Sequence, residues 1–187
     1  MPPKVKITKE DIIATAIDLI RNSGPDSINA RAIATLLDCS TQPIFSNFST
    51  MEELQKAVIM EAYELYLASI KNEIESGNYP QYKAYGMAYI RFAEKEKELF
   101  KLLFMCDRNG EDFIPTMDFE DSVDIIMNAN GISKEKATLI HLEMWVCVHG
   151  IATMMATSFL YFDWNLISNM ISDVYQGIRS RHLLEEN

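Results

Sequence analysis

Apolar residues recur every three or four positions along most of this chain, which is the pattern of amphipathic helices rather than of alternating strands. The first apolar stripe lies in residues 8–22 and ends at Gly24-Pro25, a pair that terminates helices; it consists of Ile12, Ile13, Ala16, Ile17 and Ile20. Across the whole sequence, periodicity and breaks predict an all-α protein of about nine helices. These span residues 8–22, 30–37, 41–47, 51–75, 82–93, 96–105, 116–129, 133–161 and 163–184.

Several predicted helix starts carry a small polar residue whose side chain can accept a hydrogen bond from an unpaired backbone amide. Thr8 is followed three residues later by Asp11, and Thr50 is followed by Glu53, which is the spacing of a capping box. Further caps are expected at Asn29, Ser40 and Asp163.

Residues 29–54 predict two short helices joined by a tight turn, and then the start of a long helix. The first helix has one apolar face, made of Ala30, Ile33, Ala34 and Leu37, and Asp38-Cys39-Ser40 forms the turn. In the second helix we expect Ile44, Phe45 and Phe48 to face the core. The outward side chains are expected to be Thr41, Gln42, Ser46 and Asn47. One buried face and one short polar face are what a helix-turn-helix needs to read the major groove of DNA.

This stretch resembles the DNA-binding domain of TetR-type transcriptional regulators. The resemblance rests on Ile33-Ala34, on Cys39-Ser40 in the turn, and on the run from Ile44 to Leu54, all without a gap. Three positions depart from the usual pattern of the family. Asp38 stands where Gly is usual, Asn47 where His or Tyr is common, and Met51 where a Lys ordinarily sits beside a DNA phosphate. Aspartate tolerates a left-handed backbone better than most residues, so the turn is expected to form.

The resemblance implies a ligand-responsive repressor that binds a palindromic DNA operator as a homodimer, joined through residues 135–161 and 163–184. It implies a DNA-binding domain over residues 1–50 and a ligand-binding and dimerisation domain over residues 51–187. The side chains expected to read base edges are Thr41, Gln42, Ser46 and Asn47. Those expected to contact or approach phosphates are Phe45, Thr50, Arg31, Lys6 and Lys9.

Within the long apolar helix, Trp145, His149 and Gly150 resemble the Trp…His-Gly signature of one carboxy-terminal domain type of these regulators. A small, largely apolar effector is expected among aromatic and methionine side chains, because methionine adapts to irregular shapes. The expected ligand-binding residues are Phe92, Phe104, Met105, Met117, His141, Met144, Trp145, His149 and Met154. Such residues at helical spacing also fill ordinary cores, so a plain core is the alternative.

The charge of the chain weighs against strong DNA binding. Its 187 residues carry a net charge of −10. Residues 1–50 hold as many basic as acidic side chains, so the excess of carboxylates lies in residues 51–187. Affinity for DNA depends on Lys and Arg neutralising phosphates. A second reading therefore stays open, in which this is a helical ligand- or partner-binding protein with weakened DNA binding.

Other kinds of function have little support. The cysteines at positions 39, 106 and 147 lack the spacing of a disulfide framework or a zinc motif. Cys147 and His149 point about 200° apart on a helix, so they cannot form a local catalytic dyad. We expect no enzymatic activity and no cofactor.

The cytoplasm is the expected location, because the amino end lacks the apolar core of a signal peptide. The uncharged run 145–162 only reaches the lower length limit of a membrane span. We therefore predict a buried bundle or interface helix there and no membrane partner.

Overall fold

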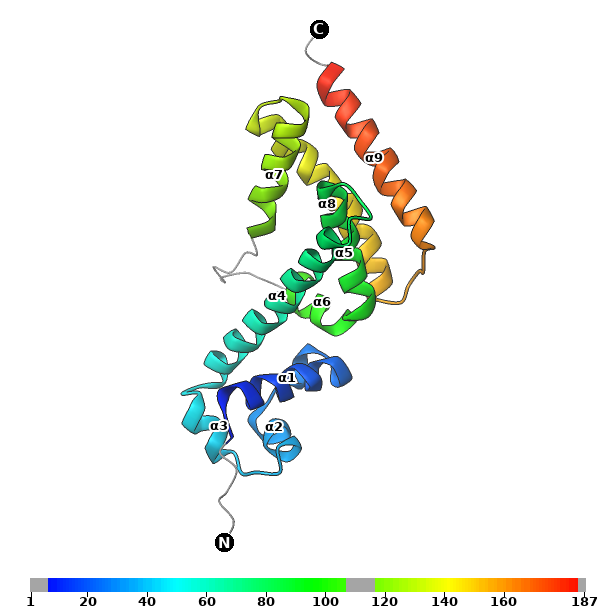
Figure 1. The fold of residues 1–187 in the computed structure, drawn as a ribbon. Helices are drawn as coiled ribbons and strands as arrows, with labels where there is room; N and C mark the ends of the chain where they lie inside the picture. The colour runs from blue at the N-terminus through cyan, green and yellow to red at the C-terminus, as the bar shows by residue number, and fades with distance from the viewer. Residues whose placement is uncertain (1–6, 107–116, 185–187) are drawn as a thin grey trace. The chain divides into compact units, whose positions relative to one another are not determined.

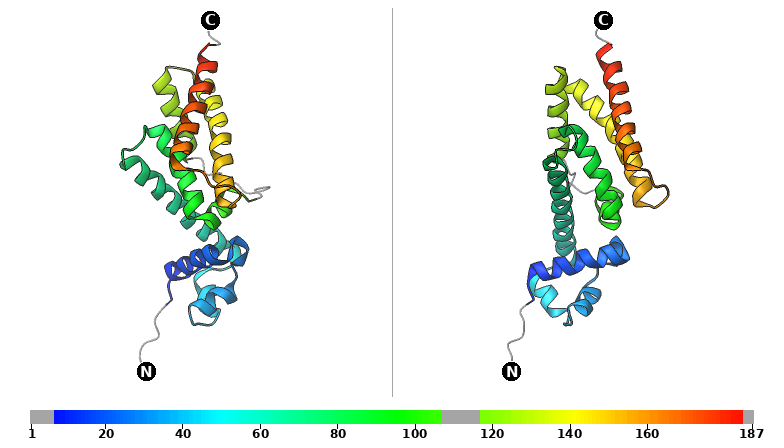
Figure 2. Two further views of the ribbon diagram at one scale, coloured as in Figure 1. Left: turned by 90° about the vertical axis from the view of Figure 1, so that its right-hand side faces the viewer. Right: turned by 45° about the vertical axis from the view of Figure 1, so that its right-hand side comes forward.

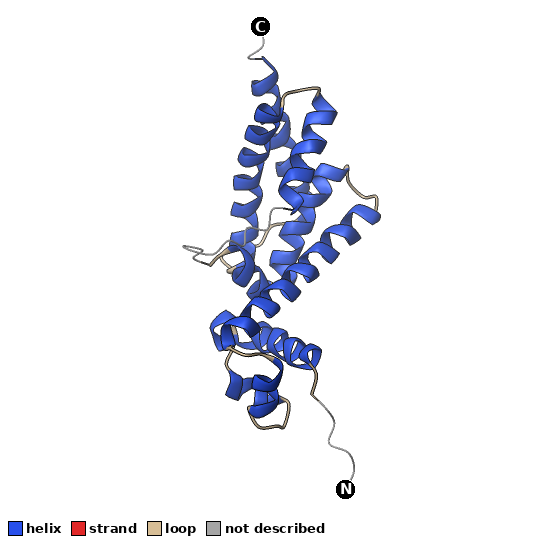
Figure 3. Ribbon diagram, turned by 90° about the vertical axis from the view of Figure 1, so that its left-hand side faces the viewer, coloured by secondary structure: helices blue, strands red, loops and turns tan. Residues whose placement is uncertain are grey.

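The structure is a computed structural model that describes residues 7–106 and 117–184, and within these ranges it contains only helices and connecting loops (Figure 3). The predicted all-α fold with nine helices is confirmed for this part of the chain. The helices, labelled in Figure 1, are α1 (Lys9–Ser23), α2 (Ala30–Leu36), α3 (Gln42–Asn47), α4 (Met51–Glu75), α5 (Gln81–Lys95), α6 (Lys97–Phe104), α7 (Met117–Asn130), α8 (Lys134–Ala156) and α9 (Trp164–Leu184). A short 3-10 turn, η1 (Pro25–Ser27), follows α1. The predicted loop over residues 106–115 lies, apart from Cys106, outside the described residues.

Four of the helix starts are set by caps that the sequence predicts, at Thr8, Asn29, Thr50 and Asp163. The backbone amide of Asp11 donates to the Thr8 hydroxyl at 3.1 Å, and the Thr8 amide donates to the Asp11 carboxylate at 2.9 Å. The Asn29 side chain accepts from the amide of Ala32 at 2.9 Å, and the Asp163 carboxylate accepts from the amide of Asn165 at 2.8 Å. Each such cap stabilises its helix by about 0.5–2 kcal/mol.

Two predicted helix boundaries are wrong. Ser40 does not cap α3, since the helix begins at Gln42 after Thr41 and has no side-chain cap bond. The long apolar helix does not reach Tyr161 but ends at Ala156, because Ser158 adopts a left-handed backbone with φ of 56°. The amide of Phe159 then donates to the carbonyl of Met154 at 3.0 Å, which closes the helix end.

The chain forms two compact units. One contains Met1–Leu65 and Glu96–Cys106, and the other contains Tyr66–Lys95 and Asp107–Asn187. The helix α4 is continuous through the boundary between Leu65 and Tyr66. The functional division at residue 50 stays a prediction, because packing groups the first half of α4 and all of α6 with the amino-terminal helices.

The core of the first unit is built by four helices and the start of α4. Helix α1 packs against α2, α3 and α6, so a segment distant in sequence completes the amino-terminal core. Side chains with at most 2% of their surface exposed come from all of these elements: Ile12, Ala16, Ile20, Ile33, Ile44, Phe48, Leu54, Leu99, Phe100 and Leu103. Burial of one large apolar side chain contributes about 1.5–3 kcal/mol, so α6 is part of what holds the amino-terminal helices in place.

The second unit is a helical bundle in which α8 packs against α5, α7 and α9. Figure 2 shows α8 and α9 running side by side within this unit. By length and composition α8 could also cross a membrane, a test that core helices of globular proteins pass as well. Its buried side chains include Ile140, Met144, Val148, Ile151 and Met155, as expected of a bundle helix.

Candidate nucleic-acid interface

The α2–turn–α3 segment is held by buried side chains on one face and by a left-handed residue in the turn. Asp38 has φ of 48°, and its amide donates to the carbonyl of Thr35 at 3.2 Å. Ile33, Ile44 and Phe48 are buried with at most 2% exposure. These contacts fix which face of α3 points away from the core, as a helix-turn-helix requires.

The outward face of α3 carries Gln42, Phe45 and Ser46, all of which are exposed. These positions are three and four residues apart and therefore share one side of the helix. The prediction that Phe45 faces the core is wrong, because 49% of its surface is exposed. Ile44 and Phe48 are one turn apart and already fill the inner face, whereas Phe45 is rotated about 100° from Ile44. The exposed phenyl ring of Phe45 and the side-chain amide of Gln42 thus share the outer face of α3.

Two of the predicted base-reading side chains are engaged within the protein. The Ser46 hydroxyl donates to the Gln42 carbonyl at 2.9 Å. The Asn47 amide group donates to the carbonyl of Pro43 at 2.8 Å and to that of Ile7 at 3.3 Å, and the side chain is half-buried. Asn47 therefore ties α3 to the residues that precede α1. Its prediction as a base-reading residue stays untested.

The basic side chains of this unit lie outside α3, which contains no Lys or Arg between Gln42 and Asn47. Arg31 is exposed in the first turn of α2. Lys9 lies 3.6 Å from the carboxylate of Glu53, and its ammonium group is 4.9 Å from the centre of the Phe48 ring. Lys6, also predicted to approach phosphates, lies outside the described residues. Any neutralisation of phosphates therefore comes from the flanks of α3.

The start of α4 is organised by Thr50 and Glu53, beside the half-buried Met51. The Thr50 hydroxyl accepts from the Glu53 amide at 3.1 Å, so the predicted cap forms. The Glu53 carboxylate accepts from the amide of Ser49 at 2.7 Å rather than from that of Thr50. This backbone hydrogen bond, with a smaller effect from Lys9, lowers the pKa of Glu53. Thr50 is exposed, as a residue near DNA would be.

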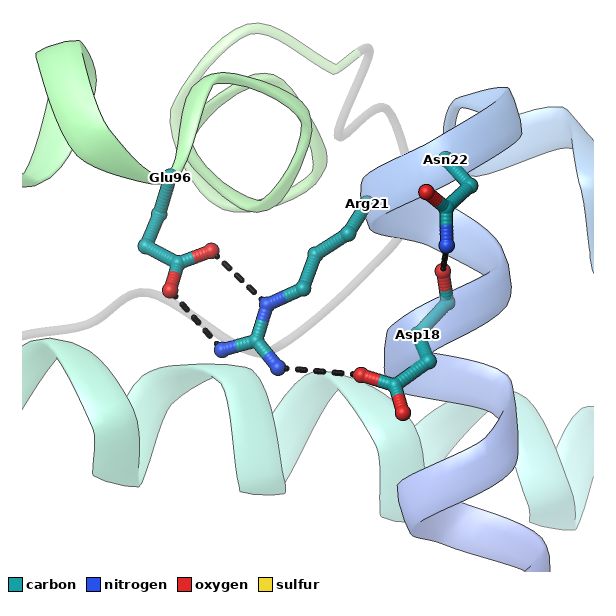
Figure 4. A network of polar contacts seen from close by, with 4 residues as sticks. All are labelled: Asp18, Arg21, Asn22 and Glu96. Atoms are coloured by element: carbon teal, nitrogen blue, oxygen red, sulfur yellow. Dashed lines mark hydrogen bonds and ion pairs between the residues drawn. The ribbon is translucent and has the colours of Figure 1, made fainter.

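An ion-pair network joins α1 to the residue that precedes α6, as Figure 4 shows. The Arg21 guanidinium donates to both carboxylate oxygens of Glu96, at 2.9 and 2.8 Å, and to the carboxylate of Asp18 at 3.2 Å. The hydrogen bonds to Glu96 raise the pKa of Arg21. This bidentate hydrogen bonding fixes both the distance and the relative orientation of the guanidinium and carboxylate groups, so it orients α6 against α1.

In the second unit the two predicted ligand-binding histidines are paired with tyrosines. The Tyr89 hydroxyl lies 2.9 Å from Nδ1 of His149, whose ring stacks on Trp145 with centroids 5.0 Å apart. The Tyr82 hydroxyl lies 3.1 Å from Nδ1 of His141. Burial lowers the pKa of His149, and it lowers the pKa of His141 to about 4. Both rings are therefore neutral near pH 7.

The other predicted ligand-binding residues do not all meet. Phe92 and Met144 are buried in the second unit, and Trp145 and Met154 are exposed there. Phe104 and Met105 belong to the first unit, and the side chain of Met117 lies outside those described. Ring contacts in the second unit instead link a set that the sequence prediction named only in part: Phe92, Tyr66, Tyr89, His149 and Trp145. Tyr89 could have been found from its helical spacing to Phe92, but Tyr66 comes from α4 and carries no local signal. In the described ranges no three His, Cys, Asp or Glu side chains come together as a metal site.

Comparison with known proteins agrees with this arrangement. Two solved structures share the fold. One is described as a TetR family protein from Vibrio parahaemolyticus (TM-score 0.63, 14% identity, 89% of this chain and 96% of that chain). The other is a TetR-like transcriptional regulator from a Rhodococcus species (TM-score 0.58, 15% identity, 98% of each chain). The fold is that of TetR-like regulators.

The chain also resembles a regulator in its sequence. The chain is 22% identical, over 157 residues, to an uncharacterised HTH-type transcriptional regulator of Mycobacterium tuberculosis, covering 81% of this chain and 72% of that protein. No protein-family model matches. The resemblance of residues 145–150 to the Trp…His-Gly type stays a prediction.

Proposed function

We propose that this chain is a DNA-binding transcriptional regulator of the TetR type, acting in the cytoplasm as a repressor. The observation that carries the proposal is the α2–turn–α3 segment, in which Ile44 and Phe48 are buried while Gln42, Phe45 and Ser46 face outward. Helix α3 would lie in a major groove, with Arg31, Lys9 and Lys6 near the phosphates on either side. Thr50 and the start of α4 would approach the backbone, as the family resemblance implies.

A homodimer formed through α8 and α9 is part of this proposal. Leu139, Leu142 and Val146 are exposed and form one stripe on α8, and Leu166 is exposed on α9. At Gly150 no atom beyond its chain neighbours and the adjacent backbone of α8 lies within 4 Å of where a Cβ would be, which leaves room for a closely packed partner helix. Exposed apolar surface of this kind supports an interface between two copies. Two α3 helices would then bind half-sites about 34–36 Å apart, or a multiple of that, on a palindromic operator.

An effector site is proposed around Trp145, His149 and Tyr89. A neutral histidine bonded to a tyrosine and stacked on an indole offers an apolar surface with one polar contact, which suits a small and largely apolar ligand. Met144 and Phe92 would line the same region. Helix α4 continues from one unit into the other, so it is the element through which ligand binding would shift the population of DNA-competent dimers.

The test of the proposal is a selection of bound duplexes from random DNA by the purified full-length protein at low salt. A palindromic motif with half-sites about one helical turn apart is the expected result. If the protein is folded and dimeric but enriches no DNA sequence, the second reading is favoured, in which this is a ligand- or partner-binding protein with weakened DNA binding. The absence of Lys and Arg from α3 supports that second reading.

The variant Met51→Lys distinguishes the two readings further, because Lys is the usual residue at this position in the family that the chain resembles. If the wild type already docks on DNA, the variant changes affinity only modestly. Binding that appears only in the variant would support the second reading.

A further inference from the structure

The side chains that α3 offers to DNA carry unusual chemistry for a recognition helix. Guanine is most often read by Arg or Lys donating to its O6 and N7 atoms. Helix α3 has neither residue along its whole length. Ser46 and Asn47 already donate to carbonyl groups of the protein, at 2.9 Å for Ser46 and at 2.8 and 3.3 Å for Asn47. Thr41, the fourth predicted base-reading residue, directly precedes α3 and is half-buried. Apart from Ser46, the exposed groups of α3 are the amide of Gln42 and the phenyl ring of Phe45.

Each of these two groups matches one feature of an A·T pair. The amide of glutamine can both donate to N7 and accept from the N6 amino group of adenine, whereas guanine presents two acceptors at these positions. A phenyl ring has no hydrogen-bonding group and gains free energy only by covering apolar surface. The 5-methyl group of thymine is the apolar group that the major groove presents.

We propose that the base pairs facing α3 are A·T pairs, with Gln42 bonded to adenine and Phe45 covering a thymine methyl group. The inference rests on the proposed function and adds the sequence class of the operator to it. Gln42 and Phe45 are three residues apart on one side of α3, so they face neighbouring base pairs rather than distant ones. Arg31 lies on α2 and is free to contact guanine elsewhere in the half-site.

The proposal has a test that needs no change in the protein. The probe is the duplex enriched from a random library by the full-length protein, prepared a second time with deoxyuridine in place of each α3-facing thymidine in one half-site. Deoxyuridine keeps the base pairing and removes only the methyl group. Loss of one buried methyl contact weakens binding about fourfold, the fold-change that corresponds to about 0.8 kcal/mol.

Variants assign the effect to the residue. Phe45→Ala should bind the thymidine and deoxyuridine duplexes equally. Met60→Ala is the matched control, because Met60 is also an apolar residue with similar exposure, 46%, on α4. It should keep the fourfold preference. Adenine replaced by 7-deazaadenine removes the N7 acceptor and should weaken binding by wild type about tenfold but leave Gln42→Ala unaffected.

Failure of the A·T proposal and failure of the proposed regulator function give different results. Enrichment of a palindrome with G·C pairs at the α3-facing positions, or equal binding of the thymidine and deoxyuridine duplexes by wild type, overturns the inference and leaves the regulator proposal standing. No enrichment of any motif overturns the regulator proposal and the inference with it.

Discussion

The left-handed turn at Asp38 provides a prediction that depends directly on the backbone of the α2–turn–α3 segment. A left-handed backbone is unfavourable by about 1–2 kcal/mol for most L-residues, less for Asp and Asn, and not at all for Gly. Asp38 has φ of 48° and is exposed, so substitutions there alter backbone strain without opening a cavity. Asp38→Ala should lower the free energy of unfolding by about 1 kcal/mol. Asp38→Asn should match the wild type.

For Asp38→Gly, relief of strain is offset by the larger conformational entropy that glycine loses on folding, about 0.5–1 kcal/mol. The expected rank of stability is therefore Gly close to Asp, Asp equal to Asn, and Ala lowest. In thermal unfolding followed by circular dichroism, 1 kcal/mol corresponds to about 2–4 °C for a chain of this length. Asn serves as the control for charge, because it removes the carboxylate and keeps the tolerance for left-handed backbone.

All three variants remove one negative charge beside the proposed DNA surface, so at low salt each should raise DNA affinity to a similar extent. The free energy of unfolding would therefore differ among the three variants, whereas their affinity for DNA would rise by a similar amount in each. If Asp38→Ala melts together with Asp38→Gly, the turn is not left-handed at this residue and the placement of α3 derived from it fails.

Three further predictions concern burial, ion pairing and assembly. Burial lowers the pKa of His141 from 6.5 to about 4. The unfolded chain therefore binds a proton at this residue more readily than the folded chain does. The contribution of neutral His141 to the free energy of unfolding is complete above pH 6.5 and is lost as the pH falls toward 4. The loss is about 1–2 kcal/mol after allowance for partial exposure, and urea titrations of His141→Phe should show a flatter pH dependence. A double-mutant cycle with Arg21→Met and Glu96→Gln should give a coupling of about 0.5–1.5 kcal/mol that shrinks with salt, and no coupling at low salt would contradict the network in Figure 4. If the proposed homodimer forms through α8 and α9, Val146→Glu, at a position that is 67% exposed on α8, should give a monomer in sedimentation velocity, whereas Met60→Glu should stay dimeric.

Local signals in the sequence were enough for most helices. Thr8, Asn29 and Asp163 each lie within three residues of the amide that they cap, so their role is visible in the sequence itself. The end of α8 was missed because the Thr157-Ser158 pair has neither Gly nor Pro, and the apolar residues continue to Phe162. Serine does not favour the left-handed backbone that Ser158 adopts, so the residue type gave no signal for this helix end.

The site was harder to predict than the fold because its contacts are distant in sequence. The inner face of α3 has room for Ile44 and Phe48 but not for Phe45, and a count of apolar residues could not decide among the three. The bond from Asn47 to the Ile7 carbonyl joins residues 40 positions apart. The pairing of Tyr89 with His149 spans 60 positions, and neither partner signals the other.

The central claim is that α3 recognises a DNA sequence while flanking cations hold the phosphates. The most direct measurement is a salt titration of binding to the selected duplex and to a scrambled duplex of the same composition. The logarithm of both affinities should fall linearly with the logarithm of salt concentration, with a slope of about −0.9 for each phosphate neutralised. The selected duplex should keep an advantage of at least about 1,000-fold throughout. Equal affinities for the two duplexes, or affinities that do not change with salt, would contradict recognition of a sequence by α3.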